Sequence, residues 1–153
     1  MMEDPCQRVM EGSVIAAAIA NDGIAMDPYI IDHIQSPEGT TTNTTAPKIL
    51  SQACSSQTAS KVKEAMLGVV ESGTGTYAQV SGVEVAGKTG TPETSTGANS
   101  AFIGFAPYDD PTLAISVLII QTDDDTSVYQ QASIVAGEVM AACISVQASG
   151  AAS

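Results

Sequence analysis

Apolar residues recur at helical spacing in two stretches of the first half of the chain. Asp4 as N-cap and Pro5 as first helical residue begin the first predicted helix, and the turn at residues 21–23 ends it. The second predicted helix runs from Ser56 or Thr58 to Glu71. Spacings of three and four residues place one apolar face on each helix. These faces are Met10, Val14, Ala17 and Ala18 in the first helix, and Val62, Met66, Val69 and Val70 in the second.

Between the two helices the pattern is that of extended chain. The apolar and β-branched run from Pro28 to Ile34 predicts a strand, and the turn-forming residues 36–39 end it. The stretch from Thr40 to Pro47 is polar, which fits the far arm of a hairpin or a loop. The two helices are therefore expected to flank a hairpin region.

The second half predicts three strands and a final helix. The first two strands are Val83 to Thr91, whose residues alternate, and Phe102 to Ala106, which Pro107 ends. The third, Leu113 to Ile120, is almost wholly apolar, which predicts a strand that is central or covered on both faces. Ser127 and Gln130 form a capping box for the last helix.

This order of elements predicts an α+β domain: an antiparallel sheet packed with helices, plus an N-terminal helix-hairpin-helix region. A chain of 153 residues is long enough for one such domain with its own core. We place the domain at residues 1–147 and expect residues 148–153 to be a disordered tail.

Charge and composition exclude several classes of partner. The chain has 17 acidic and 5 basic residues and a net charge of −12, so it lacks the clustered cations that bind nucleic acid. A single histidine and three scattered cysteines give no metal-ligand spacing, and we expect no cofactor. No signal peptide or apolar run of about 20 residues is evident, so we expect no targeting or transmembrane segment in this chain.

The strongest chemical signal is Lys88-Thr89-Gly90-Thr91, because Lys-Thr-Gly is a signature of penicillin-binding proteins and β-lactamases. A strand at the rim of a cleft can pair with an extended peptide as an added strand. Lys88 and Thr89 would attract a substrate carboxylate, and Gly90 would leave room for close approach. The backbone N–H of Thr91 would then be placed to stabilise an oxyanion.

Several further segments resemble class B penicillin-binding proteins in order and spacing. They are Ala16–Gly23, Pro28-Tyr29, Val69–Thr76, Val85–Glu93 and Ala101–Pro107. The resemblance implies the C-terminal part of a peptidoglycan D,D-transpeptidase domain on the extracytoplasmic face of the bacterial membrane, with three strands of the family's five-stranded sheet. It implies D-alanyl-D-alanine stem peptides and β-lactams as ligands, Lys88, Thr89 and Gly90 as carboxylate-binding residues, and the Thr91 N–H as an oxyanion-hole donor.

The chain departs from the family in its nucleophile. The family's Ser-x-Asn motif does not occur. One Ser-x-x-Lys occurs, from Ser60 to Lys63, but it stands only 28 residues before Lys88 and reads as the solvated start of a helix. The chain alone is therefore expected to be inactive. The alternative is a non-catalytic peptide-binding or interaction module derived from this fold; a β-lactamase or β-lactam sensor is less favoured.

The resemblance also bears on association. In the family, the first strands of the sheet come from upstream sequence and pair beside the last strand. Without them, Leu113–Ile120 would be an open apolar edge, and such edges pair with other chains. Such an edge would invite self-association through this strand.

Overall fold

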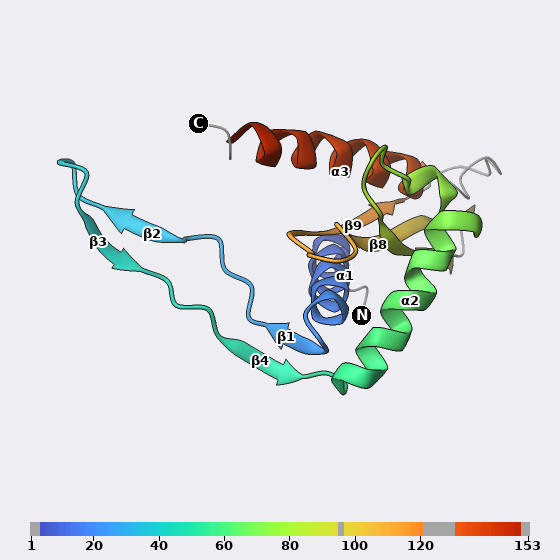
Figure 1. Cartoon of the computed structure of the whole chain (residues 1–153), viewed down its shortest axis with the longest axis horizontal. Coiled ribbons are helices and arrows are strands. Elements are labelled where there is room, and N and C mark those ends of the chain that lie inside the picture. Colours follow the sequence, from blue (N-terminus) through green and yellow to red (C-terminus); the bar gives the residue numbers. More distant parts are fainter. Residues whose placement is uncertain (1–3, 95–96, 121–130, 151–153) are drawn as a thin grey trace.

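The computed structural model describes residues 4–94, 97–120 and 131–150. It consists of a body, in which helices cover a small sheet, and a long arm that extends from it (Figure 1). The helices are α1 (Pro5–Ala20), α2 (Ser56–Ser72) and α3 (Gln131–Gly150), with a short 3-10 helix η1 (Thr76–Ala78) after α2. The body strands are β5 (Ala86–Gly90), β8 (Ser100–Ala106) and β9 (Leu113–Ile119), and a short hairpin of β6 (Glu93–Thr94) and β7 (Gly97–Ala98) connects β5 to β8.

The body strands form an antiparallel sheet in the order β5-β8-β9. The register pairs Lys88 with Ile103 and Thr89 with Phe102. The α+β class and the antiparallel sheet are therefore confirmed. Helix, hairpin and helix also precede the sheet in the predicted order.

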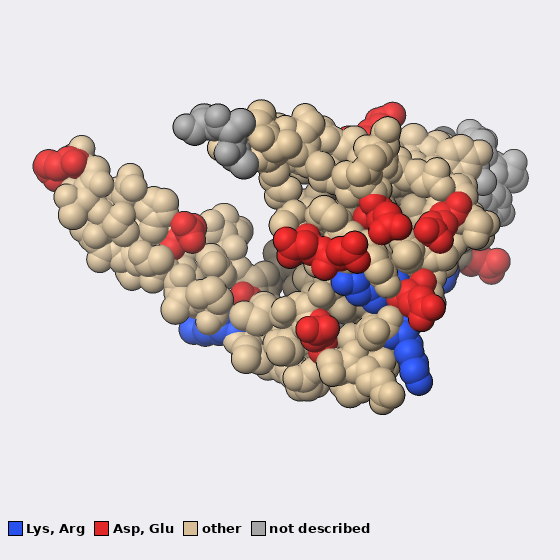
Figure 2. Space-filling view, in the orientation of Figure 1, with Lys and Arg blue, Asp and Glu red and all other residues tan. Residues whose placement is uncertain are grey.

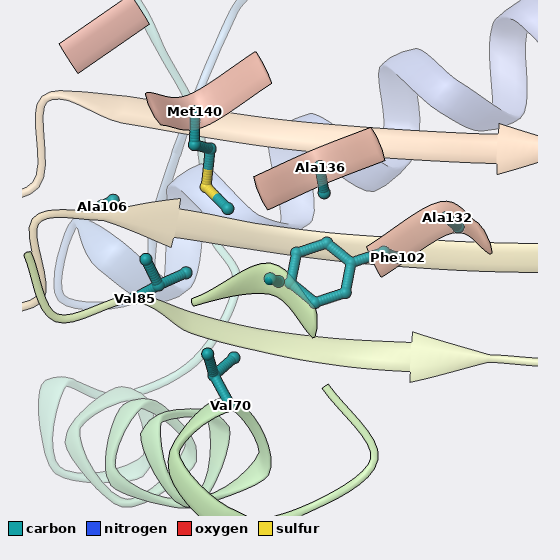
Figure 3. Close-up of a cluster of buried hydrophobic side chains, with 8 residues drawn as sticks. Val70, Val85, Phe102, Ala106, Ala132, Ala136 and Met140 are labelled. Atoms are coloured by element: carbon teal, nitrogen blue, oxygen red, sulfur yellow. The ribbon is translucent and has the colours of Figure 1, made fainter. Parts of the chain in front are cut away.

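Two layers of side chains hold the helices against the sheet. On one face, α3 packs over Phe102, and the end of α2 contributes to the same cluster (Figure 3). This larger cluster consists of Val70, Ala78, Val85, Phe102, Ala106, Ala132, Ala136 and Met140. On the other face, Met66 of α2 packs against Ala86 and Phe105, with Ile19 of α1 beside them. Both phenylalanines are fully buried.

Strand β9 is covered on both faces, as its apolar sequence predicts. Leu113, Ile115, Val117 and Ile119 pack on the cluster beneath α3. From the other side α1 lies so close that a Cβ on Gly12 would be 2.5 Å from the Ser116 Oγ. Unlike a central strand, β9 stands at the edge of the sheet, with no strand on its outer side among the residues described.

Helices α1 and α2 begin where the sequence predicts, because at each start a side chain accepts a hydrogen bond from an otherwise unpaired backbone N–H. The Asp4 carboxylate accepts from the Cys6 N–H at 3.0 Å, and the Ser55 hydroxyl accepts from the Thr58 N–H at 3.2 Å. The predicted apolar face of α1 is partly wrong. Met10 is 54% exposed, whereas Ala16 and Ala18 are buried, since the close approach of α1 to the sheet admits only small side chains.

The predicted strand at residues 28–34, which lies in the arm, is largely wrong. Only its end forms a strand, β2 (His33–Gln35), which pairs with β3 (Thr41–Thr44), so the polar stretch does form the far side of a hairpin. At the arm's base, β1 (Ile24–Met26) pairs with β4 (Ile49–Gln52), a pair the sequence did not predict. Ile30 is 95% exposed. Strand propensity reflects how well side chains pack on a half-buried surface, and this part of the arm has no such surface against which to pack.

Helix α3 differs from expectation in two ways. It continues through residues 148–150, where a disordered tail was expected, and the Ser149 hydroxyl donates to the carbonyls of Ser145 and Val146 in the preceding turn. It is also long and apolar enough to cross a membrane by length and composition alone, a property that the sequence pattern did not indicate. Five of its 20 residues are buried in the body. The predicted capping box lies outside the described residues.

Two glycines of β5 give a matched test of this packing. A Cβ on Gly87 would lie 2.2 Å from the Phe102 Cζ, whereas a Cβ on Gly90 would meet only the Ala101 Cβ, at 3.5 Å. We expect Gly87→Ala to lower the free energy of unfolding by about 3 kcal/mol, the upper end for an overpacked core. Gly90→Ala should change it by less than about 0.5 kcal/mol. Urea unfolding followed by circular dichroism measures both, and equal stability of the two variants would contradict this packing.

Candidate functional site

Lys88, Thr89 and Gly90 lie together on β5, the edge strand opposite β9. The ladder with β8 ends at the pair Gly90–Ala101, so Thr91 follows the strand and is exposed. Lys88 is exposed, and its Nζ donates to the carbonyl of Thr89 at 2.6 Å. On the side of β5 away from β8, no strand pairs with it in the described part of the chain. That edge can therefore accept an extended ligand as an added strand.

Lys88 borders a hollow of about 470 Å³ between α1, α2 and the sheet. Its walls are mostly apolar, with Met66 and Val69 from α2 and Ile103 from β8, and Lys61 is the second cation at its border. Two of the five basic residues therefore meet at one hollow in a chain of net charge −12. Elsewhere acidic side chains dominate, as the face in Figure 2 shows. The hollow is a local exception that favours an anionic group attached to an apolar one.

Gly90 is not required by the fold. Its backbone does not have a positive φ, and the nearest obstacle to a Cβ is ordinary contact with Ala101. Gly87, three residues before it, is required because Phe102 occupies the space over it. Neither its backbone conformation nor its neighbours therefore require a glycine at position 90.

The structure adds Thr74 to the residues identified from sequence. Its hydroxyl Oγ1 lies 2.6 Å from the Thr89 Oγ1, 15 residues away along the chain. The only sequence signal for this residue was its place in the Val69–Thr76 segment, which served there as a mark of resemblance. A hydroxyl contact between a turn and a strand has no periodicity by which sequence could reveal it.

The Ser60–Lys63 pair has no catalytic geometry. Lys63 points to the rings of Tyr108 and Phe105, with its Nζ 4.8 Å and 5.7 Å from their centroids. A lysine in such a cation–π contact is not directed at Ser60. Ser60 is exposed on α2 and does not border the hollow beside Lys88. The geometry supports its interpretation as a surface residue of a helix.

Metal chemistry finds no support in the described residues, among which no three His, Cys, Asp or Glu side chains form a group that could hold an ion. The acidic run Asp123–Asp125 lies outside them. The three cysteines, all within the described ranges, are free thiols.

Residues 10–144 match the family model of the penicillin binding protein transpeptidase domain. Among curated proteins, peptidoglycan D,D-transpeptidase PbpA of Mycolicibacterium smegmatis is 36% identical over 123 residues, which cover 77% of this chain and 25% of that protein. Stage V sporulation protein D of Bacillus subtilis is 34% identical over 123 residues, covering 75% of this chain and 18% of that protein. The chain thus spans a quarter or less of the length of these relatives.

Solved structures agree. The D,D-transpeptidase domain of a peptidoglycan glycosyltransferase from Eggerthella lenta superposes with a TM-score of 0.79 at 37% identity, over 88% of this chain and 31% of that one. Penicillin-binding protein A from M. tuberculosis, solved as a ceftriaxone acyl-enzyme complex, gives 0.73 at 33% identity, over 84% and 30%. With its fold and residues 10–144 matched, the chain belongs to the penicillin-binding protein transpeptidase domain family.

Proposed function

We propose that this chain is the ligand-holding part of a peptidoglycan D,D-transpeptidase, and that it binds a D-alanyl-D-alanine stem peptide or a β-lactam along β5. The observation that carries the proposal is the position of Lys88, Thr89 and Gly90 on an edge strand beside a hollow with two lysines. The acyl-enzyme complex of the M. tuberculosis relative with ceftriaxone supports a β-lactam as one ligand.

Each residue has a distinct part in holding the ligand. The ligand backbone pairs with the outer edge of β5, and its carboxylate binds the Lys88 ammonium and the Thr89 hydroxyl. The Lys88 Nζ, which donates to the Thr89 carbonyl in the free chain, exchanges this neutral acceptor for the ligand's charged one. Gly90 lets the ligand lie close to the strand. The N–H of Thr91 serves the oxyanion that forms when a serine attacks the ligand's carbonyl.

The attacking serine is not in these 153 residues. The chain has no Ser-x-Asn, and its one Ser-x-x-Lys directs the lysine to aromatic rings. Acyl transfer therefore requires sequence that this chain does not contain. A transpeptidase acting on peptidoglycan works at the extracytoplasmic face of the membrane, and we place the function there.

A fluorescent penicillin distinguishes binding from acylation. We expect no covalent label on the chain after denaturing electrophoresis, because Ser60 has no base directed at it. A labelled transpeptidase run in parallel shows that the reagent is active. A labelled band that persists in wild-type chain and disappears in Ser60→Ala would show that the Ser60–Lys63 pair is a nucleophile after all.

Reversible binding tests the proposed ligand-holding role. We expect penicillin G to shift the amide resonances of β5 in ¹⁵N-labelled chain, and Lys88→Gln to weaken binding roughly tenfold, since it removes a charge-assisted bond. Gly90→Ala should weaken binding without loss of stability. The control is Lys48→Gln, because Lys48 lies on the arm and does not line the hollow; this variant should bind as tightly as wild type. Unshifted β5 resonances at millimolar ligand would contradict the proposal and favour an interaction module.

We further propose self-association through β9. The strand carries no charge and no proline, and its outer edge is unpaired in the described chain. Natural sheets protect such edges with charges, prolines or covering elements. Here α1 and α3 cover the faces of β9 and leave the outer edge itself without a strand partner.

Sedimentation velocity over a hundredfold concentration range tests this association. We expect dimers or larger species at high concentration, and a shift toward monomer in Leu118→Lys, because a lysine opposes edge pairing. Leu118 belongs to neither of the two core clusters but is half-buried on the face of β9 that α1 covers, so circular dichroism of the variant must match that of wild type before its association is compared. A wild-type chain that stays monomeric throughout would contradict association by this edge.

A further inference from the structure

The contact between Thr74 and Thr89 joins the turn after α2 to the middle of the Lys-Thr-Gly strand. The two hydroxyl oxygens are 2.6 Å apart, at the short end of O–H···O bonds. Thr89 is the residue whose hydroxyl the proposed function assigns to a ligand carboxylate. A neighbour at hydrogen-bond distance therefore acts directly on the group that would meet the ligand.

The turn that carries Thr74 is held firmly on the end of α2. The N–H groups of Gly73 and Gly75 both donate to the carbonyl of Val69, at 3.1 Å and 3.0 Å. A Cβ on Gly73 would lie 2.9 Å from the Val69 Cα and carbonyl oxygen, and one on Gly75 would lie 3.2 Å from that oxygen. Two glycines thus let the backbone fold tightly over α2 and leave Thr74 as the one side chain between them.

A second attachment fixes the chain just after this turn. The Gln79 amide donates to the carbonyls of Val70 and Glu71, at 3.0 Å and 3.1 Å, and so satisfies acceptors that the end of a helix leaves unpaired. Helix α2 is in turn fixed against β5 through Met66 and Ala86. Thr74 and Thr89 therefore stand on supports packed against each other, so their contact can define an orientation.

We propose that Thr74 is a positioning residue for Thr89. A threonine hydroxyl has one proton and two acceptor lone pairs. When Thr74 donates to Thr89, it holds Thr89 in one side-chain rotamer and leaves the Thr89 proton free to point to an incoming carboxylate. Without Thr74 the Thr89 hydroxyl rotates freely, and the ligand must restrict that rotation when it binds. This role rests on the proposed function of Thr89.

The rotamer of Thr89 gives a test that needs no ligand. Three-bond couplings from the Thr89 methyl carbon to its backbone nitrogen and carbonyl carbon report its χ1 angle in labelled full chain. We expect one rotamer in wild type and in Thr74→Ser, which keeps the hydroxyl, and averaging in Thr74→Val, which keeps only the shape. Amide spectra of β8 and β9 confirm that each variant is folded. Identical Thr89 couplings in wild type and Thr74→Val would overturn the proposal.

Binding of penicillin G supplies the second measurement. Thr74→Val should raise the dissociation constant roughly fivefold, the effect of one hydrogen bond, and Thr74→Ser should restore it to within about twofold of wild type. In Thr89→Val, the further change Thr74→Val should have no effect, because the two residues act through one contact. Weaker binding in Thr89→Val with no effect of Thr74→Val would overturn the positioning role and leave the proposed function standing. Failure of wild type to bind would refute the proposed function, and the coupling measurement would still decide whether Thr74 orients Thr89.

Discussion

The ring of Phe102 lies over two glycines, Gly87 on the neighbouring strand β5 and Gly104 on its own strand, and the position of the candidate site depends on this contact. A Cβ on either glycine would come within 3 Å of the ring. Ala132, Ala136 and Met140 of helix α3 pack against the Phe102 ring (Figure 3). Because the ring holds β5 at one distance from β8, the three residues after Gly87 are presented at the sheet edge in a defined register.

The sequence predicted the body of this structure well, because local and tertiary signals agree there. The cap Asp4, the helix start at Ser56 and the apolar run of β9 describe elements that the core also demands. The strand predicted from Val83 to Thr91 is shorter in the structure, where β5 begins at Ala86 and has adjacent buried residues, Ala86 and Gly87, because both faces of the sheet are covered there. The arm was predicted less well. Apolar residues such as Ile30 normally indicate burial, but in the described part of the chain Ile30 is exposed. The hydrophobic pattern assigned this segment to a strand because that method assumes that apolar residues face a core.

For the candidate site, the sequence identified the residues of the motif but did not reveal which other side chains contact them. Lys88, Thr89 and Gly90 form a motif that can be read along the chain, and the structure places them on one edge strand. The contact from Thr74 and the direction of Lys63 toward Tyr108 depend on how α2 meets β5, which is a matter of packing. The sequence also could not show that the fold requires glycine at position 87 but not at position 90, because this difference depends on where the Phe102 ring lies.

The hollow with Lys61 and Lys88 carries a consequence for ionic strength. A chain of net charge −12 repels any anion at long range, whereas these two lysines attract one at short range. Salt screens the distant repulsion more than the contact, because the Debye length is about 30 Å at 0.01 M and about 8 Å at 0.15 M. If the hollow binds an anionic ligand as proposed, we expect binding to be stronger at physiological salt than in dilute buffer, the opposite of the usual behaviour of a cationic binding site.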